Sequence, residues 1–234
     1  MMPDHEHIYR QEANLYDRLI AREDYEGNVS RMLAQLMPLD SHAVDVLDLG
    51  AGTGKLTTIL APQVRSIVAT DASQAMLDVA SSKLHALGCT NGTTVVCDHR
   101  SLPFPDGSFD LVTAGWTVCY LTHTNEPNWQ RNLRSIMAEI RRVLRPSGTV
   151  ILFENDGTGS TIPDPPSFLT GYFRELTDTY GFRQSSFRTD FRFESPEEAE
   201  QLTRFFFGDG LADRVRADRL QDVPGCTAVF AKTF

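Results

Sequence analysis

The segment VDVLDLGAGTGKLTTIL, residues 44–60, decides the fold of this chain. Its first part, Val44–Leu49, has the apolar composition of a buried strand, and its last part, Gly54–Leu60, is typical of a helix. Between them lie three glycines within five residues: Gly50, Gly52 and Gly54. A strand, a glycine-rich turn and a helix in this order place bare backbone amides at the carboxyl edge of a sheet, where α/β folds bind ligands.

The same alternation of strand and helix continues along the chain. The pattern predicts a helical stretch over residues 8–37 that stops at Pro38, strands at Arg65–Thr70, Thr93–Cys97, Phe109–Ala114 and Thr149–Phe153, and helices at Ser73–Leu87 and Glu126–Leu144. Apolar strands separated by helices indicate a parallel sheet covered on both faces. Near the C-terminus, SFRTDFRFE alternates like a half-exposed strand, and a helix follows with Ser195 as its cap, Pro196 at the first helical position and Glu198 completing a capping box. With the last strand, GCTAVFAKTF, this pattern indicates an antiparallel addition at one edge.

Length and composition indicate one soluble domain, because the chain has 234 residues, of which 41% are hydrophobic and 23% charged. A net charge of -9 makes nucleic acid and anionic membrane unlikely partners. The four scattered cysteines predict reduced, mostly buried thiols and no metal site. Without a membrane-spanning run or a signal peptide, the sequence predicts a cytoplasmic protein.

Two aspartates follow the next strands after the glycine turn. Asp71 ends the second strand, 21 residues after Gly50, where a carboxylate can accept hydrogen bonds from both hydroxyls of a ribose. Asp98 ends the third strand, where a carboxylate can accept from the exocyclic amine of an adenine. Lys55 occupies the position of the third glycine of the dinucleotide fingerprint, which disfavours a nicotinamide enzyme.

The blocks VLDLGAGTGKLT, VATDAS, VVCDHRSLPFPDGSFDLVTAGW and EIRRVLRPSGTVILFE resemble the class I S-adenosylmethionine-dependent methyltransferases. The closest group is type 11, the ubiquinone/menaquinone methyltransferase-like enzymes. The resemblance covers roughly Val44 to Glu154 and implies a Rossmann-like, doubly wound sheet in the order 3-2-1-4-5-7-6, with the last strand antiparallel. It implies a single domain, with residues 1–40 as a helical lid, 44–154 as the cofactor-binding core and 155–234 as the acceptor-side elaboration and edge strands.

The same resemblance assigns the cofactor, S-adenosylmethionine, and its product, S-adenosylhomocysteine. The glycine turn would make room for the methionine part and the ribose, with Asp48 orienting the turn. Asp71 would bind the ribose, and Asp98 with the backbone of His99 and Arg100 would bracket the adenine. The remaining contacts implied are those of Ala51, Ala72, Met76, Ala114, Gly115 and Trp116.

Methyl transfer from a sulfonium needs an aligned, desolvated acceptor more than a fixed catalytic residue. Three candidates follow from position: His123 as a general base, Glu154 as a proton acceptor or a ligand for a cation, and Tyr16 in the lid near the reacting end. For each, an ordinary surface or packing role is the alternative. The loop Asp156–Pro166 is long enough to form the rim of an acceptor site.

Several functions stay open at this point. The favoured one is methylation of a small organic acceptor by a monomer or homodimer. A tRNA or protein substrate is an alternative, although the chain reads AGWTVCY where amine-directed nucleic-acid enzymes carry an N-P-P-Y/F motif. The arginines of the long helix favour a solvated face over an RNA surface. A regulatory module that binds S-adenosylmethionine without catalysis is the third reading.

Overall fold

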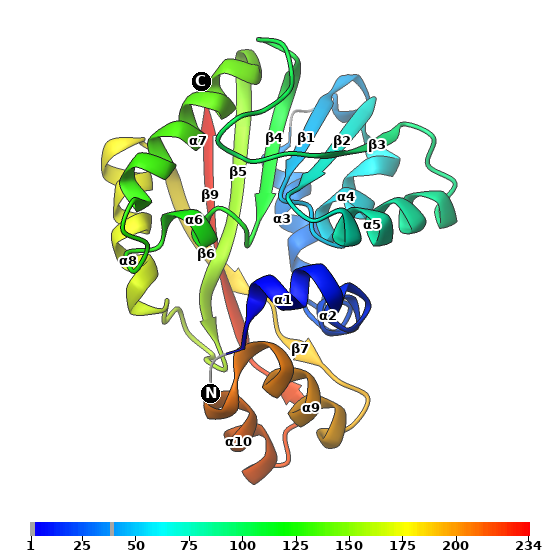
Figure 1. Cartoon of the computed structure of the whole chain (residues 1–234), viewed down its shortest axis with the longest axis vertical. Coiled ribbons are helices and arrows are strands. Elements are labelled where there is room, and N and C mark those ends of the chain that lie inside the picture. The colour runs from blue at the N-terminus through cyan, green and yellow to red at the C-terminus, as the bar shows by residue number, and fades with distance from the viewer. Residues whose placement is uncertain (1–2, 38–39) are drawn as a thin grey trace.

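A seven-stranded sheet forms the centre of the computed structural model, which describes residues 3–37 and 40–234 (Figure 1). Its strands are β1 (Asp45–Leu49), β2 (Ser66–Asp71), β3 (Gly92–Val96), β4 (Phe109–Gly115), β5 (Leu144–Thr158), β6 (Arg183–Arg188) and β9 (Gly225–Thr233). Their order is β3-β2-β1-β4-β5-β9-β6, and β9 pairs antiparallel with both of its neighbours. Since β9 is the seventh strand of this sheet in chain order, the predicted order and the antiparallel last strand are confirmed.

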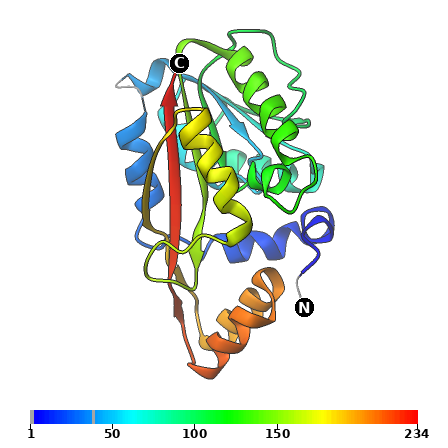
Figure 2. The same cartoon turned by 90° about the vertical axis from the view of Figure 1, so that its left-hand side faces the viewer.

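Helices cover both faces of the sheet (Figures 1 and 2). One face carries α3 (Asn28–Leu36), α4 (Lys55–Leu60) and α5 (Gln74–Ala86), and the other carries α6 (Cys119–Thr122), α7 (Trp129–Val143) and α8 (Ser167–Arg174). In α7 the buried apolar side chains recur every three or four residues, at Leu133, Ile136, Met137, Ile140 and Val143. This spacing places them in one stripe against the sheet, so the helix docks on that face.

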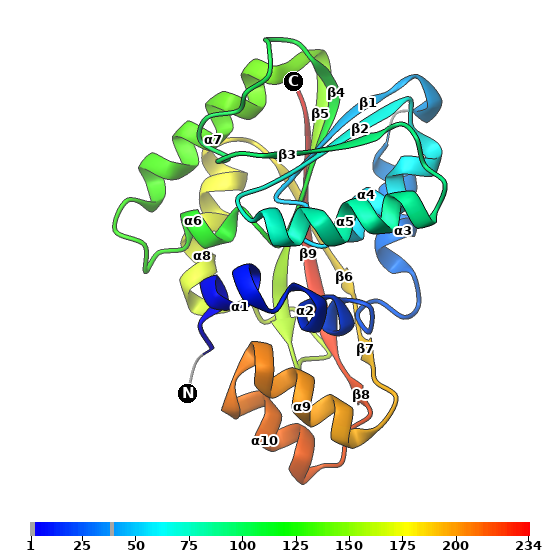
Figure 3. The ribbon, with the colours of Figure 1, turned by 45° about the vertical axis from the view of Figure 1, so that its right-hand side comes forward.

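A smaller part of the molecule lies beyond the carboxyl ends of the parallel strands (Figure 3). It consists of α1 (His5–Gln11), α2 (Ala13–Ile20), β7 (Phe191–Arg192), α9 (Pro196–Phe207), α10 (Asp209–Ala217) and β8 (Asp222–Val223). We call these six elements the cap. They enclose an apolar cluster of their own, separate from the two clusters beside the large sheet. The cap therefore joins segments from both ends of the sequence.

The N-terminal region differs from the prediction of a helical stretch over residues 8–37. Three helices form there instead, because the chain turns between α2 and α3 with positive φ angles at Asp24 (62°) and Gly27 (73°). The predicted stop at Pro38 lies outside the described residues. The half-exposed strand predicted at SFRTDFRFE is divided between the end of β6 and β7, and neither the short helix α6 nor β8 was predicted.

The prediction of mostly buried cysteines is wrong in part, since Cys226 is buried while Cys89, Cys97 and Cys119 are partly exposed. All four are free thiols. Among residues 3–37 and 40–234, no helix combines the length and the apolar character needed to cross a bilayer.

Candidate functional site

The glycine turn joins β1 to α4 with left-handed backbone at all three glycines, at φ angles of 65° for Gly50, 55° for Gly52 and 86° for Gly54. A Cβ atom on Gly50 would lie 2.0 Å from Oγ1 of Thr117, and one on Gly54 would lie 3.0 Å from the Cβ of Ala80. These two glycines are required by close packing. Gly52 has no such neighbour, so its surface remains open for contact with a ligand.

Asp71 lies beside this turn, at the end of β2. Its carboxylate accepts hydrogen bonds from the backbone N–H groups of Gly52 at 3.0 Å and Ser73 at 2.9 Å. Burial raises the pKa of this carboxyl above its usual value, while the backbone donors oppose that shift. Two backbone donors leave part of its acceptor capacity free, so Asp71 can also accept from hydroxyls of a ligand on the turn.

Asp48 is buried beneath the turn and does not reach its surface. One carboxyl oxygen accepts from the hydroxyl of Thr57 on α4, and the other accepts from the hydroxyl of Thr113 on β4 at 2.9 Å. Burial raises the pKa of Asp48 to about 6. These contacts connect β1 with the helix and the strand beside it, which fits the predicted role of orienting the turn.

Asp98, which follows β3, has a side-chain partner that the prediction did not include. Asp98 forms a two-pronged ion pair with the guanidinium of Arg100, in addition to accepting from the Arg100 backbone N–H. The guanidinium holds the pKa of Asp98 below its usual value. The side chain of Arg100 therefore neutralises Asp98, where only its backbone was expected beside the adenine.

His99 faces the interior. Its Nε2 lies 3.1 Å from Oγ1 of Thr117, the residue that packs against Gly50, while Nδ1 has no partner. Burial lowers the pKa of His99 to about 4, so the imidazole is neutral near pH 7. The ring supports the turn from the β3 side and keeps one unused nitrogen.

The segment leaving β4 packs against neighbouring helices. Ala114 is buried, and a Cβ atom on Gly115 would lie 2.9 Å from a methyl group of Leu56 on α4. Trp116 has a positive φ of 52° and stacks on Phe153 of β5. The three predicted positions thus shape the floor of the site.

Three further predicted residues occupy different environments. Ala51 donates its backbone N–H to the carbonyl of Thr70, which ties the turn to β2. Ala72 is exposed after Asp71, and Met76 is buried in α5 with 2% of its surface exposed. Met76 is therefore a core side chain in this structure.

Tyrosines from the cap cover the open side of the turn. The nearest atom to a Cβ on Gly52 is Cε1 of Tyr16, at 3.9 Å. The ring of Tyr9 meets Tyr16 edge to face at 5.4 Å and Tyr120 at 5.6 Å, and the Tyr9 hydroxyl donates to that of Tyr120. Burial raises the pKa of Tyr9 and of Tyr16, so both hydroxyls are neutral donors near pH 7. Only Tyr16 was predicted here.

Glu154 lies in β5, one residue past the last pairing of β4 with β5, and has 1% of its surface exposed. Its Oε1 accepts from the Tyr172 hydroxyl at 3.0 Å and from the Cys119 backbone N–H at 3.2 Å, while Oε2 is buried without a partner. Burial raises the pKa of Glu154 to about 7. This carboxyl can exchange a proton near neutral pH.

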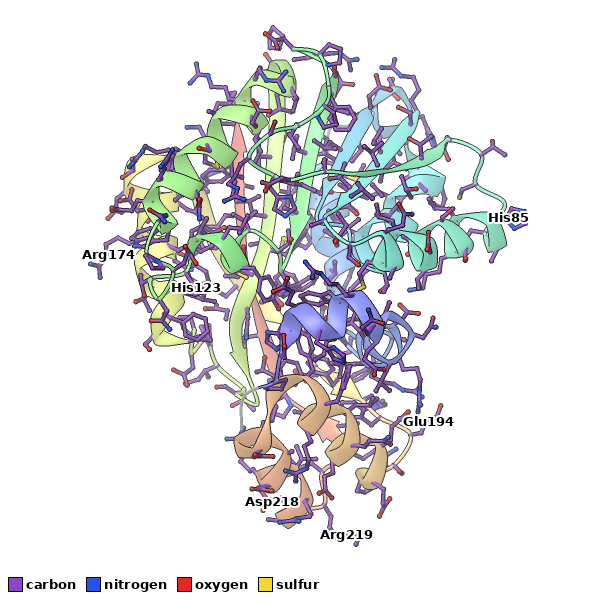
Figure 4. All side chains as sticks on the ribbon, in the orientation of Figure 1. His85, His123, Arg174, Glu194, Asp218 and Arg219 are labelled. Atoms are coloured by element: carbon purple, nitrogen blue, oxygen red, sulfur yellow. The ribbon has the colours of Figure 1, made fainter. Side chains whose placement is uncertain are left out.

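His123 lies farther out, where α6 ends beside α8 (Figure 4). Its ring packs edge to face against Phe168 at 5.7 Å, and the contacts described for residues 3–37 and 40–234 do not bring it to the tyrosines. The structure therefore brings Tyr16 and Asp71 together at the turn, but it does not add His123 to that group.

Unpartnered buried atoms mark the region as a ligand site. Within the described part of the chain, six buried side-chain atoms lack hydrogen-bond partners: Nε of Arg22, Oγ1 of Thr53, Nδ1 of His99, Nδ1 of His123, Oε2 of Glu154 and Oδ2 of Asp156. Those of Thr53, His99 and Glu154 lie in the glycine turn, after β3 and in β5, at the carboxyl edge of the sheet. Buried polar atoms are rarely left unpaired, so their gathering here fits a polar ligand such as a nucleoside.

Two hollows flank this region. One, of about 260 Å³, is lined by Arg100, Asn128, Arg131, Asn132 and Ser135. The other, of about 350 Å³, is bordered on one side by Glu23, Lys55 and Lys83. Neither is lined by Gly52 or Asp71.

Two solved structures have folds similar to that of this chain. The crystal structure of YcgJ from Bacillus subtilis superposes with a TM-score of 0.59 at 18% identity, covering 89% of this chain and 98% of that one. The [4+2]-cyclase SpnF superposes with a TM-score of 0.58 at 22% identity, covering 88% of this chain and 79% of that one. Together with the strand order and the glycine turn, these likenesses define the class: the Rossmann-like fold of class I methyltransferases.

Part of the chain is also similar in sequence to known proteins. Residues 47–152 match the family model of a methyltransferase domain. The uncharacterized methyltransferase YcgJ of B. subtilis is 29% identical over 141 residues, which are 60% of this chain and 51% of YcgJ. The ubiquinone/menaquinone biosynthesis C-methyltransferase UbiE of Burkholderia thailandensis is 36% identical over 112 residues, 47% of this chain and 42% of UbiE. The chain thus spans about half the length of the curated relatives it matches.

Proposed function

We propose that the chain is a methyltransferase that uses S-adenosylmethionine to methylate a small organic acceptor. The observation that carries the proposal is the pairing of an open Gly52 with the carboxylate of Asp71, next to buried polar atoms without partners. The fold alone does not settle the reaction, because it also occurs in a protein named a cyclase. The methyltransferase-domain match over residues 47–152 supports methyl transfer.

Different residues would bind different parts of the cofactor. Gly52 and Asp71 would hold the ribose and the adjoining chain of the cofactor, and His99 with Asp98 would flank the adenine. The cofactor supplies an activated methyl group on a sulfonium, so the protein needs to align the acceptor and exclude water. Tyr16 and Tyr9, from the cap, lie where they exclude water from the turn.

We assign the proton acceptor to Glu154 rather than to His123. Glu154 combines burial, an oxygen without a partner and a pKa near 7, and it lies at the ends of β4 and β5, where the acceptor is expected. Tyr172 and the Cys119 backbone fix one carboxyl oxygen and leave the other for the acceptor. An acceptor whose O–H or N–H must lose its proton would deliver it to Oε2.

Calorimetry with S-adenosylmethionine, S-adenosylhomocysteine and NAD tests the cofactor. We expect micromolar binding of the first two, no binding of NAD and at least a hundredfold loss of affinity in Asp71→Ala. Asp110→Ala, far from the turn at the start of β4, is the matched control and should bind as the wild type does. Equal binding by Asp71→Ala would contradict the site assignment.

A panel of small acceptors with labelled methyl donor tests the reaction itself. The proposal expects transfer to at least one small phenol, amine, thiol or activated carbon acceptor. Transfer only to bulk tRNA or protein would favour the macromolecular alternative. Binding of S-adenosylhomocysteine without any transfer would favour a regulatory module.

A further inference from the structure

The cap holds the N-terminal helices to the C-terminal part of the chain through apolar contacts. Ile8 and Leu19, from α1 and α2, share one buried cluster with Phe193, Leu202 and Val223. Burial of such side chains stabilises the cluster by removing apolar surface from water. The two helices therefore belong energetically to the cap.

Contacts between the cap and the helices beside the glycine turn are polar instead. Ser73 donates its hydroxyl to the Tyr9 carbonyl at 2.7 Å, and Lys83 forms an ion pair with Asp17. The net stabilisation from a polar contact of this kind is smaller than that from burying a large apolar side chain, because the contact replaces hydrogen bonds to water. The surface between α1–α2 and the turn is thus the weaker boundary, and it lies where the cofactor must enter.

Lys55 makes the most enclosed of these polar contacts. As the first residue of α4, it directly follows the glycine turn, and its Nζ lies 2.6 Å from Oε2 of Glu23. The two side chains are only 16% and 10% exposed, against 33% and 23% for Lys83 and Asp17. The same ammonium lies 5.1 Å above the ring of Trp116, so ring and carboxylate both stabilise it.

Glu23 belongs to the cap through its backbone. It forms an isolated antiparallel bridge with Phe191 of β7, and the preceding Arg22 carbonyl accepts from the Arg192 N–H at 2.9 Å. The neighbouring Asp24 is not an alternative partner for Lys55, because its two oxygens accept from the N–H groups that begin α3. Glu23 is therefore the acid of this turn that binds Lys55.

We propose that Lys55 and Glu23 form a clasp that positions the cap, holding Tyr16 above Gly52 and thereby setting the affinity of the turn for its nucleoside ligand. Neither residue touches the reacting atoms, so both are positioning residues. The clasp rests on the proposed function, since it assumes that the ligand lies between Tyr16 and the turn. The clasp gives Lys55 a role at the position where a dinucleotide-binding turn has glycine.

Limited trypsin digestion without any ligand tests the clasp first. Glu23→Gln and Lys55→Met keep the side-chain length and remove one charge each. We expect cleavage after Arg18 and Arg22 to be about tenfold faster than in the wild type, because the cap opens more often. Glu197→Gln, which removes an exposed cap carboxylate paired with Arg219, is the control and should match the wild type. Unchanged cleavage in both clasp variants would overturn the proposal.

Affinity for S-adenosylhomocysteine provides the second readout. Each single variant should bind about tenfold more weakly by calorimetry, and the double variant Glu23→Gln/Lys55→Met no more weakly than either single one, because the pair acts as one unit. The reversal Glu23→Lys/Lys55→Glu should recover part of the lost affinity. Additive losses would overturn the clasp.

The outcomes separate the clasp from the function on which it rests. Absence of S-adenosylhomocysteine binding by the wild type would remove the proposed function and the clasp together. Wild-type binding with unaltered affinity in both variants would remove the clasp alone. Circular dichroism establishes that each variant is folded, and if a single variant is not, the reversed pair carries the test.

Discussion

Gly50 and Gly88 show two different demands on a glycine with positive φ, at 65° and 69°. At Gly88 an added Cβ would meet nothing within 4 Å, whereas at Gly50 it would collide with Thr117. Gly88→Ala should cost about 1 kcal/mol from backbone conformation alone. Gly50→Ala should cost about 2–4 kcal/mol in the free energy of unfolding, because it adds overpacking. Denaturant titration compares the two, and equal losses would contradict the close packing at the turn.

Glu154 should make stability depend on pH in a defined direction. Its folded pKa of about 7 lies above the usual 4.5, so ionisation is easier in the unfolded chain. The stability that the neutral carboxyl contributes is complete below pH 4.5 and is lost as pH rises through 7, by about 3 kcal/mol in total. Glu154→Gln keeps the shape of the side chain but removes its ionisation.

Denaturant titrations at pH 5, 7 and 9 measure this effect. The difference in free energy of unfolding between Glu154→Gln and wild type should grow toward pH 9. A difference that stays constant across this range would show that Glu154 does not titrate there. Methyl transfer should rise with pH through about 7 in the wild type and lose that dependence in the variant.

At the residue level the sequence could predict the acids but not their partners. Asp48 and Asp71 were found because they follow or precede the turn at fixed spacing, and spacing survives folding. The pairing of Asp98 with Arg100 and the contact of Tyr9 with Tyr120 depend on side-chain rotamers and on residues 111 positions apart. No local pattern encodes such contacts.

Among the elements, α9 begins as its sequence predicts. The hydroxyl of Ser195 accepts from the Glu198 N–H at 3.1 Å, and Pro196 occupies the first helical position. The Glu198 carboxylate reaches back to the Glu194 N–H at 2.8 Å instead of the expected N–H of Ser195, while it also binds Arg22 of the cap. The start of this helix is therefore tied to α2.

Ser195→Ala should lower the free energy of unfolding by about 1 kcal/mol, because the cap hydrogen bond to the first turn is lost. Ser195→Asp should retain most of the stability, since aspartate also caps and favours the positive end of the helix dipole. Thermal denaturation of the three proteins measures the effect. A stable Ser195→Ala would indicate that the tie through Glu198 holds the helix without its cap.

The elements that prediction missed share a physical cause. The parallel strands β1, β4 and β5 were identified because they are apolar and mostly buried, whereas the edge strand β3 is partly exposed. The segment α1–α3 is three separate helices, because the chain turns twice and thereby places Tyr16 against the glycine turn. The short α6 is held by Glu154 and Tyr172 from other elements rather than by its own propensity.

Across the whole molecule, several arginines on or next to α7 are engaged by acidic or aromatic side chains. Arg142 binds Glu139 and Asp106, Arg145 at the start of β5 binds Asp110 and Asp45, and Arg141 lies over the ring of Phe234. Internal pairing engages Arg141, Arg142 and Arg145, while Arg131 and Arg134 of α7 stay exposed to solvent. This agrees with the predicted solvated face.

Fluorescence polarisation with labelled tRNA at about 0.15 M salt should therefore detect no binding in the micromolar range. The net charge of -9 adds general repulsion. Salt-sensitive binding that weakens in Arg131→Gln would contradict this prediction. The cytoplasmic location and the choice between monomer and homodimer stay predictions.

The cap also fixes an order of events during synthesis. Its apolar cluster joins Leu19 to Val223, so 204 residues separate two side chains that share one core. At the usual pace of a ribosome, about 5–20 residues per second, α1 and α2 wait for about 10–40 s before their partners emerge. Throughout that interval the nascent chain exposes an amphipathic N-terminus, which makes its first helices natural clients for chaperones acting at the ribosome.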